Sequence, residues 1–349
     1  MIFKRIAALV LTVVMAAVSF TGCAKSYDKV VTVNGVDIQP SMYLYAQYIA
    51  FLEASELASN PADFLSETIE EMPAKEWIHN KTIEMLKKYV WVEEKFQELG
   101  VELTSADTEY IDYEVEYYWP IAESLMAENG IGKDAYTNFM RNEYISEYVV
   151  FQELYGDGGE YEPTDDEVVE YMDSKYARIK GFKLSKVMKD TGSFVNAEGL
   201  ADLYSVAQSA VNQLNEGADF GKVIIDSLRT AAEINGDTTV YADSDALTYS
   251  LEKYLSKENV DIYEKLFVEN AFKMDENSGW RYDDTQEEIV VYQRMKNLQD
   301  QFEIDYYKLS LTYEMCSDEY YDYIQQQTAS YEVVENADAV KYYSVEKVK

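Results

Sequence analysis

The hydrophobic pattern opens with one long apolar run and continues as helical segments. Positions 6–20 are almost entirely apolar and follow the basic pair Lys4-Arg5. A run of about fifteen apolar residues is shorter than the roughly 20 that a spanning helix needs, and a short basic stretch before it is typical of a secretory signal. We therefore expect residues 1–22 to be a signal peptide, and no later stretch has the length of a membrane span.

Cys23 follows directly on this segment and changes its interpretation. The residues before it, Ser19-Phe20-Thr21-Gly22, include the small side chains that precede a cysteine in the lipobox of bacterial lipoproteins. This resemblance implies that Cys23 is acylated and becomes the first residue of the mature chain. The expected location is the extracytoplasmic face of a bacterial cell membrane, with a lipid anchor. The alternative is an ordinary signal peptide with a cysteine nearby by chance.

The next 150 residues are dominated by helical periodicity. A short strand over 30–38 turns at Asn34-Gly35, a pair favoured in tight hairpins. Helices are expected from Pro40, over 76–98 with Gly100 as the C-terminal cap, from the N-cap Thr104 to an interruption at Trp119-Pro120, and over 133–151. Thr164 and Glu167 form a capping-box pattern at the start of one further helix.

Beyond residue 176 strands alternate with helices, which predicts an α+β unit. Strands are expected at 182–185, 238–241 and 289–292, and helices over 196–214, after Gly217, and over 260–272. From residue 299 the pattern is helical again. The tail at 340–348 alternates like a strand and is expected to pair with 30–33.

These segments predict a mainly α fold with an α+β insertion. We expect residues 23–176 and the C-terminal helices and strand of 299–349 to build one helical domain, and residues 177–298 to be a domain inserted into it. The pairing of the two chain ends is the feature on which this arrangement depends.

Composition excludes several classes of function. The formal net charge is −35, from 30 basic and 65 acidic residues, and binding to nucleic acid requires a basic surface. The chain has a single histidine, His79, and two cysteines, Cys23 and Cys316. Histidine-rich metal sites, disulfide frameworks and catalysis that depends on histidine are therefore not expected, and we predict no metal and no cofactor.

Tyrosine is abundant and follows helical spacing. The chain has 32 tyrosines, and Tyr110, Tyr113 and Tyr117 form one helical stripe while Tyr144, Tyr148 and Tyr155 form another. Tyrosine offers a large apolar area with few rotatable bonds, so the stripes are candidates for a surface that holds unfolded polypeptide. The alternative is that they are core residues of an aromatic-rich helical domain.

Several motifs in chain order resemble the exported parvulin-type foldases and chaperones, the PrsA/SurA-like group. They are residues 31–35 (VTVNG), 98–104 (ELGVELT), 164–167 (TDDE), 214–220 (LNEGADF), 235–241 (NGDTTVY) and 267–274 (FVENAFKM). The resemblance implies a SurA/PrsA-like helical domain built from both chain ends and an inserted parvulin-like domain of the peptidyl-prolyl isomerase type.

The inserted domain departs from this group at its chemistry. The resemblance implies one histidine on the first strand and one on the last, but Lys183 stands at or near the first position and the last strand, 287–292 (EEIVVY), has none. The candidate residues of a degenerate parvulin pocket are Lys183, Asp237, Tyr263, Phe267 and Phe272. No catalytic residue is assigned.

The resemblance implies a membrane-anchored chaperone or foldase that assists unfolded or folding exported proteins, with a parvulin-like domain that lacks isomerase activity. Two alternatives stay open. One is a solute-binding or adhesive surface lipoprotein, and the other is an active peptidyl-prolyl isomerase that uses non-histidine groups. Neither the clients nor the oligomeric state follow from the sequence.

Overall fold

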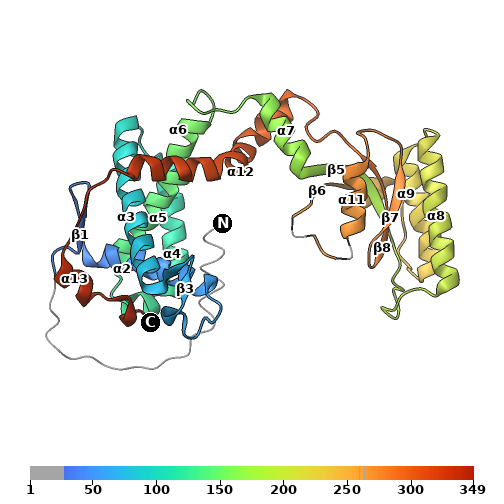
Figure 1. Ribbon diagram of the computed structural model, residues 1–349. Helices are drawn as coiled ribbons and strands as arrows, with labels where there is room; N and C mark the ends of the chain where they lie inside the picture. Colours follow the sequence, from blue (N-terminus) through green and yellow to red (C-terminus); the bar gives the residue numbers. More distant parts are fainter. Residues whose placement is uncertain (1–26, 259, 263) are drawn as a thin grey trace. The chain divides into compact units, whose positions relative to one another are not determined.

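The computed structural model describes residues 27–258, 260–262 and 264–349, which form two compact units (Figure 1). Unit 1 contains residues 27–162 together with 316–349, and unit 2 contains residues 163–315. The predicted signal peptide, Cys23 and Tyr263 lie outside the described residues. Within the described ranges, no helix is long and apolar enough to cross a membrane.

Unit 1 is mainly helical. Its helices are α2 (Pro40–Leu57), α3 (Ala74–Leu99), α4 (Ser105–Glu128), α5 (Lys133–Tyr144), a π-helical segment (Ile145–Val150), α6 (Phe151–Tyr155), the last part of α12 (Gln301–Thr328) and α13 (Ala337–Tyr342). Local signals place several of these ends as predicted. Gly100 ends α3 with φ of 66°, and Thr104 begins α4 with a capping box that Asp107 completes.

A three-stranded sheet joins the two ends of the chain, but not through the predicted tail. β1 (Val31–Val33) forms the expected hairpin with β2 (Val36–Ile38), and β1 also pairs with β9 (Val333–Glu335). The prediction of a strand over 340–348 is wrong: α13 occupies its start and a 3₁₀ turn, Val345–Lys347, its end. Asn336 caps α13, because its side chain accepts a hydrogen bond from the Ala339 backbone.

The predicted break at Pro120 is also wrong. Helix α4 continues through Pro120 to Glu128, so the proline costs the helix one backbone donor without ending it. Trp119 is buried and its ring lies 5.4 Å from that of Tyr136 on α5, measured between centroids. We attribute the continuity of the helix to this packing, because tertiary contacts routinely override a local preference.

Unit 2 is a sheet covered by helices on both faces (Figure 1). The four strands, in the order β6-β5-β8-β7, are all antiparallel to their neighbours. Helices α8 and α9 cover one face and α11 covers the other. The bounds are β5 (Tyr176–Ser185), α8 (Ala197–Asn215), α9 (Phe220–Asn235), β6 (Leu251–Ser256), α11 (Lys265–Lys273), β7 (Arg281–Asp284) and β8 (Glu288–Arg294). α7 (Asp165–Lys175) and the first part of α12 complete the unit.

Two of the three predicted strands of this unit are present, and the third is not. Residues 182–185 and 289–292 lie within β5 and β8. Residues 238–241 form no strand, because the Asp237 carboxylate accepts hydrogen bonds from the backbone and hydroxyl of Thr239 and holds a turn there. The predicted helix over 260–272 begins five residues later, at Lys265.

Candidate functional site

Helix α4 presents tyrosines to solvent along one side. Tyr110, Tyr113 and Tyr117 are 46%, 61% and 56% exposed. They stand three and four positions apart, so they share one face of the helix. The opposite face carries Ile111, Val115 and Trp119, all buried in the core of unit 1. The tyrosine face is therefore the side of α4 that is directed away from the core of unit 1.

Ring contacts extend this face onto the neighbouring helix. Tyr113 stacks on Tyr117 with 6.0 Å between ring centroids. Tyr110 lies 5.6 Å from Tyr144, which in turn stacks on Tyr148 at 5.0 Å. Tyr148 is 54% exposed. We call these side chains the tyrosine surface, which consists of Tyr110, Tyr113, Tyr117, Tyr144 and Tyr148.

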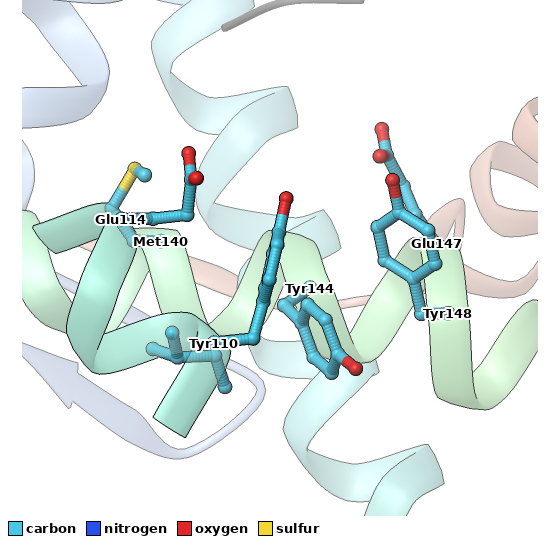
Figure 2. Close-up of a pocket in the computed structure, with 7 residues that line it drawn as sticks. Tyr110, Glu114, Met140, Tyr144, Glu147 and Tyr148 are labelled. Carbon is cyan, nitrogen blue, oxygen red and sulfur yellow. The ribbon is translucent and has the colours of Figure 1, made fainter. Parts of the chain in front are cut away.

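A shallow hollow lies within the tyrosine surface. Figure 2 shows Tyr110 and Tyr144 next to each other, with Met140 and Glu114 on one side and Glu147 and Tyr148 on the other. Its volume is about 10 Å³, which is at the lower limit for a single water molecule. Pockets for small ligands measure roughly 300–1,000 Å³. The tyrosine surface is therefore suited to a ligand that lies across it rather than one that enters a cavity.

One hydrogen bond fixes the two halves of the surface relative to each other. The Tyr144 hydroxyl donates to Oδ1 of Asp107 at 2.5 Å, while Oδ2 of Asp107 accepts from the Thr104 backbone at the start of α4. The hydrogen bond from Tyr144 lowers the pKa of Asp107. Burial, followed by the contact with Asp107, raises the pKa of Tyr144 to about 12. Tyr144 is thus a neutral donor to a charged acceptor at ordinary pH.

Carboxylates surround the rings. Helix α4 carries seven acidic side chains and no basic one: Asp107, Glu109, Asp112, Glu114, Glu116, Glu123 and Glu128. Glu116 is paired with Lys133 at 2.6 Å. On the neighbouring segment, burial and the nearby Glu143 raise the pKa of Glu147 to about 7. The surface therefore combines aromatic area with negative charge.

The candidate residues predicted in unit 2 are divided between the two faces of its sheet. Lys183 lies on β5, on the face covered by α11, and its ammonium group is paired with Glu288 of β8. Phe267 and Phe272 belong to α11 and to the same apolar cluster. Asp237 follows α9 and accepts a hydrogen bond from Tyr241, whose ring packs on the opposite cluster. The structure therefore brings Phe267 and Phe272 together but places Asp237 apart from them.

The surroundings of the two phenylalanines are closely packed. Phe267 is buried and lies edge-on to Tyr292, with 5.0 Å between ring centroids. The ammonium group of Lys257 stands 4.2 Å from the centre of the Phe272 ring, and the Arg294 guanidinium stands 5.5 Å from it. Two cations thus stand within cation–π distance of the Phe272 ring.

Hydrogen bonds at Asp283 of β7 form a polar centre that the sequence did not indicate. Its carboxylate accepts from the Tyr292 hydroxyl at 2.5 Å, the Asn270 amide at 2.9 Å and Arg281 at 2.9 Å. The side chain of Asp283 is only 12% exposed. Strand β7 has no alternating apolar pattern, so this centre could not be located from periodicity. Its donors satisfy the carboxylate, which suits a structural role.

Two further observations concern possible metal ligands and Cys316. Within the described ranges, no group of three or more His, Cys, Asp or Glu side chains is placed to hold a metal ion. Cys316 is buried on α12, where free cysteine behaves as a small apolar side chain.

The sequence matches no family model and no curated protein. The structure is similar to three solved structures of foldases. The foldase protein PrsA from Streptococcus pneumoniae is 14% identical, with 76% of this chain and 90% of that chain covered and a TM-score of 0.35. PrsA from Lactococcus lactis is 13% identical, with 93% and 100% covered and a TM-score of 0.34. PrsA from Bacillus subtilis is 15% identical, with 79% and 87% covered and a TM-score of 0.24.

Proposed function

We propose that this chain is a chaperone that binds unfolded segments of exported proteins on the tyrosine surface. In this proposal Cys23 is lipidated and tethers the protein to the extracytoplasmic face of the membrane. The parvulin-like unit contributes no prolyl isomerisation. The observation that carries the proposal is the exposure of four tyrosines on helices whose opposite faces are buried in the core of unit 1, namely Tyr110, Tyr113, Tyr117 and Tyr148.

The size of the surface supports weak, reversible binding. Each tyrosine has roughly 200 Å² of surface, so four half-exposed rings offer on the order of 400 Å². Burial at about 25 cal/mol per Å² gives a gross gain of about 10 kcal/mol. Association costs about 4–15 kcal/mol because the two molecules lose translational and rotational freedom, so the net affinity is modest. A chaperone must release its clients, and a modest affinity permits this.

The arrangement of the surface supports an extended polypeptide as the ligand. The rings follow α4 and then pass to the neighbouring helical segment, and the hollow among them is too small to enclose a small molecule. Aromatic rings accept many apolar side chains because their contacts are not directional. Binding with weak sequence preference is therefore expected.

The Lys183–Glu288 pair supports the absence of isomerase chemistry. The sequence resemblance implies two imidazoles on the first and last strands of the inserted unit. At or near the first of those positions this chain has Lys183, whose ammonium group is paired with Glu288 of β8, and the last strand, 287–292, has no histidine. A charged lysine is not a substitute for a neutral imidazole. The unit is expected to keep its fold without accelerating rotation about X-Pro bonds.

The test is suppression of client aggregation by the proposed mature chain, residues 23–349. Light scattering from thermally unfolded citrate synthase is measured with the native chain and with Tyr113→Ser/Tyr117→Ser/Tyr148→Ser. We expect the native chain to suppress scattering. The triple variant should need about a tenfold higher protein concentration for the same suppression, which corresponds to a loss of about 1.4 kcal/mol in the free energy of client binding.

A matched variant in unit 2 provides the control. Val240→Ser/Leu247→Ser/Tyr306→Ser removes three apolar side chains that are 86%, 87% and 71% exposed. It should suppress aggregation as well as the native chain does. If the native chain has no effect on scattering, or if only the control variant loses it, the proposed role of the tyrosine surface is wrong.

A further inference from the structure

We propose that the client segments preferred by the tyrosine surface are cationic, with lysine or arginine interspersed among apolar residues. This inference rests on the proposed chaperone function and specifies its client class. It follows from the way in which unpaired carboxylates and exposed rings alternate around α4.

The carboxylates lie beside the rings rather than apart from them. Glu109, Asp112 and Glu116 stand three and four positions apart and form a row along α4, next to the row of Tyr110, Tyr113 and Tyr117. Glu114 lines the shallow hollow with Tyr110, Tyr144 and Tyr148 (Figure 2). A segment that covers the rings would therefore bring its own side chains within reach of these carboxylates.

Most of this negative charge has no ion-pair partner in the described part of the chain. Lys133 pairs with Glu116, whereas Glu109, Asp112 and Glu114 form no ion pair among the residues that the structure describes. Residues 102–175 contain 20 acidic and 3 basic side chains, so few cations are available nearby. A ligand with several positive charges would relieve the mutual repulsion of these carboxylates as it binds.

The rings are also available to cations. Elsewhere the chain places its own lysines over tyrosine rings, with Lys88 at 4.8 Å from the centre of Tyr321 and Lys347 at 4.6 Å from that of Tyr342. In the described part of the chain no lysine or arginine stands over Tyr110, Tyr113, Tyr117 or Tyr148. A lysine or arginine from a client could occupy these faces, as cation–π contact favours.

The same charges argue against other occupants. A second copy of this chain would bring an equally acidic surface into contact, and like charges at an interface cost binding energy. An anionic lipid surface or an anionic polymer would be repelled in the same way. A cationic, partly apolar polypeptide is the occupant that satisfies both the rings and the carboxylates.

Three synthetic peptides test the inference with the proposed mature chain. Each has about 20 residues with the same apolar and aromatic positions, and the remaining positions carry lysine and arginine, serine and glutamine, or glutamate. Affinity is measured by fluorescence anisotropy at about 50 mM and about 300 mM salt. We expect the basic peptide to bind at least tenfold more tightly than the neutral one at low salt, and the difference to shrink at high salt because salt screens exposed charges.

A charge variant and a matched control locate the effect. Glu109→Gln/Asp112→Asn/Glu114→Gln should reduce the preference for the basic peptide about five- to tenfold and leave binding of the neutral peptide unchanged, since exposed charge pairs are individually weak but three of them act together here. Asp202→Asn/Glu216→Gln/Glu233→Gln removes three exposed carboxylates from α8, its end and α9 of unit 2. This control should keep the full preference.

The outcomes separate this inference from the proposed function. Equal binding of the basic and neutral peptides, with aggregation of citrate synthase still suppressed through the tyrosines, would overturn the inference and leave the chaperone function in place. Loss of the preference in the unit 2 control alone would also overturn it. Failure of every peptide to bind, together with no suppression of aggregation, would overturn the proposed function itself.

Discussion

Tyr144 and Asp107 connect the end of α5 to the beginning of α4 through a single hydrogen bond of 2.5 Å. The same carboxylate of Asp107 caps α4 by accepting from the Thr104 backbone and hydroxyl. One acidic side chain thus orders the helix that carries Tyr110, Tyr113 and Tyr117 and also holds the helix that leads to Tyr148. The geometry of the tyrosine surface depends on this pair.

Tyr144→Phe tests that dependence. The substitution removes the hydroxyl but keeps the ring contacts with Tyr110 and Tyr148. We expect a loss of about 1–2 kcal/mol in the free energy of unfolding, because a hydrogen bond to a charged group is disrupted. Urea unfolding followed by the fluorescence of the tryptophans measures it. Tyr110→Phe, at a hydroxyl with no described hydrogen bond, is the matched control and should change the stability by less than about 0.5 kcal/mol.

The stability of unit 1 should depend on pH through Glu147. Burial and the neighbouring Glu143 raise the pKa of Glu147 to about 7, above the value of about 4.3 of an unfolded glutamate. The folded state therefore binds the proton more tightly. Its stabilising contribution is fully present below about pH 4.3 and is lost as the pH rises through about 7.

Glu147→Gln removes this titration. We expect the variant to be more stable than the native chain by about 1–3 kcal/mol at about pH 8, and the difference to become small at about pH 4.5, where the native Glu147 is mostly protonated. Chemical unfolding at both pH values measures the two differences. A variant that is equally stable or less stable at the higher pH would contradict the raised pKa.

Asp283 should be structurally essential to unit 2. Asp283→Asn replaces a carboxylate that accepts from Tyr292, Asn270 and Arg281 with an amide that brings two donors of its own. Because the site is largely buried, we expect a loss of about 2–4 kcal/mol in the free energy of unfolding. The tryptophan of unit 2, Trp280, reports on its unfolding. Asp202→Asn, at an exposed carboxylate of α8 with no described hydrogen bond or ion pair, is the control and should change the stability by less than about 0.5 kcal/mol.

The features that could be predicted from the sequence are those fixed by short segments. The Asn34-Gly35 hairpin, the Gly100 cap and the Thr104 and Thr164 capping boxes each depend on residues within a few positions of one another. Local chemistry is sufficient for these. The helices from Ala74 and from Gln301 were also predicted, because long apolar periodicity identifies a helix reliably.

The features that were missed depend on distant partners. β9 pairs with β1 across 300 residues, and nothing in Val333–Glu335 distinguishes it locally from the tail that was predicted instead. β7 consists of Arg281–Asp284, and its polar side chains make ion pairs and hydrogen bonds rather than an apolar face. Such a strand has no hydrophobic signal to detect.

The tyrosine surface was predicted only in part. Helical spacing grouped Tyr110, Tyr113 and Tyr117 correctly, and all three are exposed. The same spacing grouped Tyr148 with Tyr155, yet Tyr155 is buried against Phe151 and Tyr320. Spacing shows which residues share a face, whereas burial depends on what packs against that face, here the later helix α12.

The last prediction concerns isomerase activity. The native chain should not accelerate cis–trans isomerisation of a short X-Pro peptide, because Lys183, paired with Glu288, stands at or near the first position where the sequence resemblance implies an imidazole, and the last strand, 287–292, has no histidine. The barrier to rotation about the X-Pro bond is about 18–20 kcal/mol. Lys183 and Glu288 are paired with each other, so we do not expect them to lower this barrier. Lys183→His alone should also leave the rate unchanged, since the last strand, 287–292, would still have no histidine. Lys183→Met is the structural control. The ion pair between Lys183 and Glu288 is partly exposed, so its loss should cost less than about 1 kcal/mol in the free energy of unfolding.

One result would contradict the prediction. If the native chain clearly accelerates isomerisation and Phe267→Ala abolishes the acceleration, while Lys183→Met leaves the fold intact, unit 2 is an enzyme.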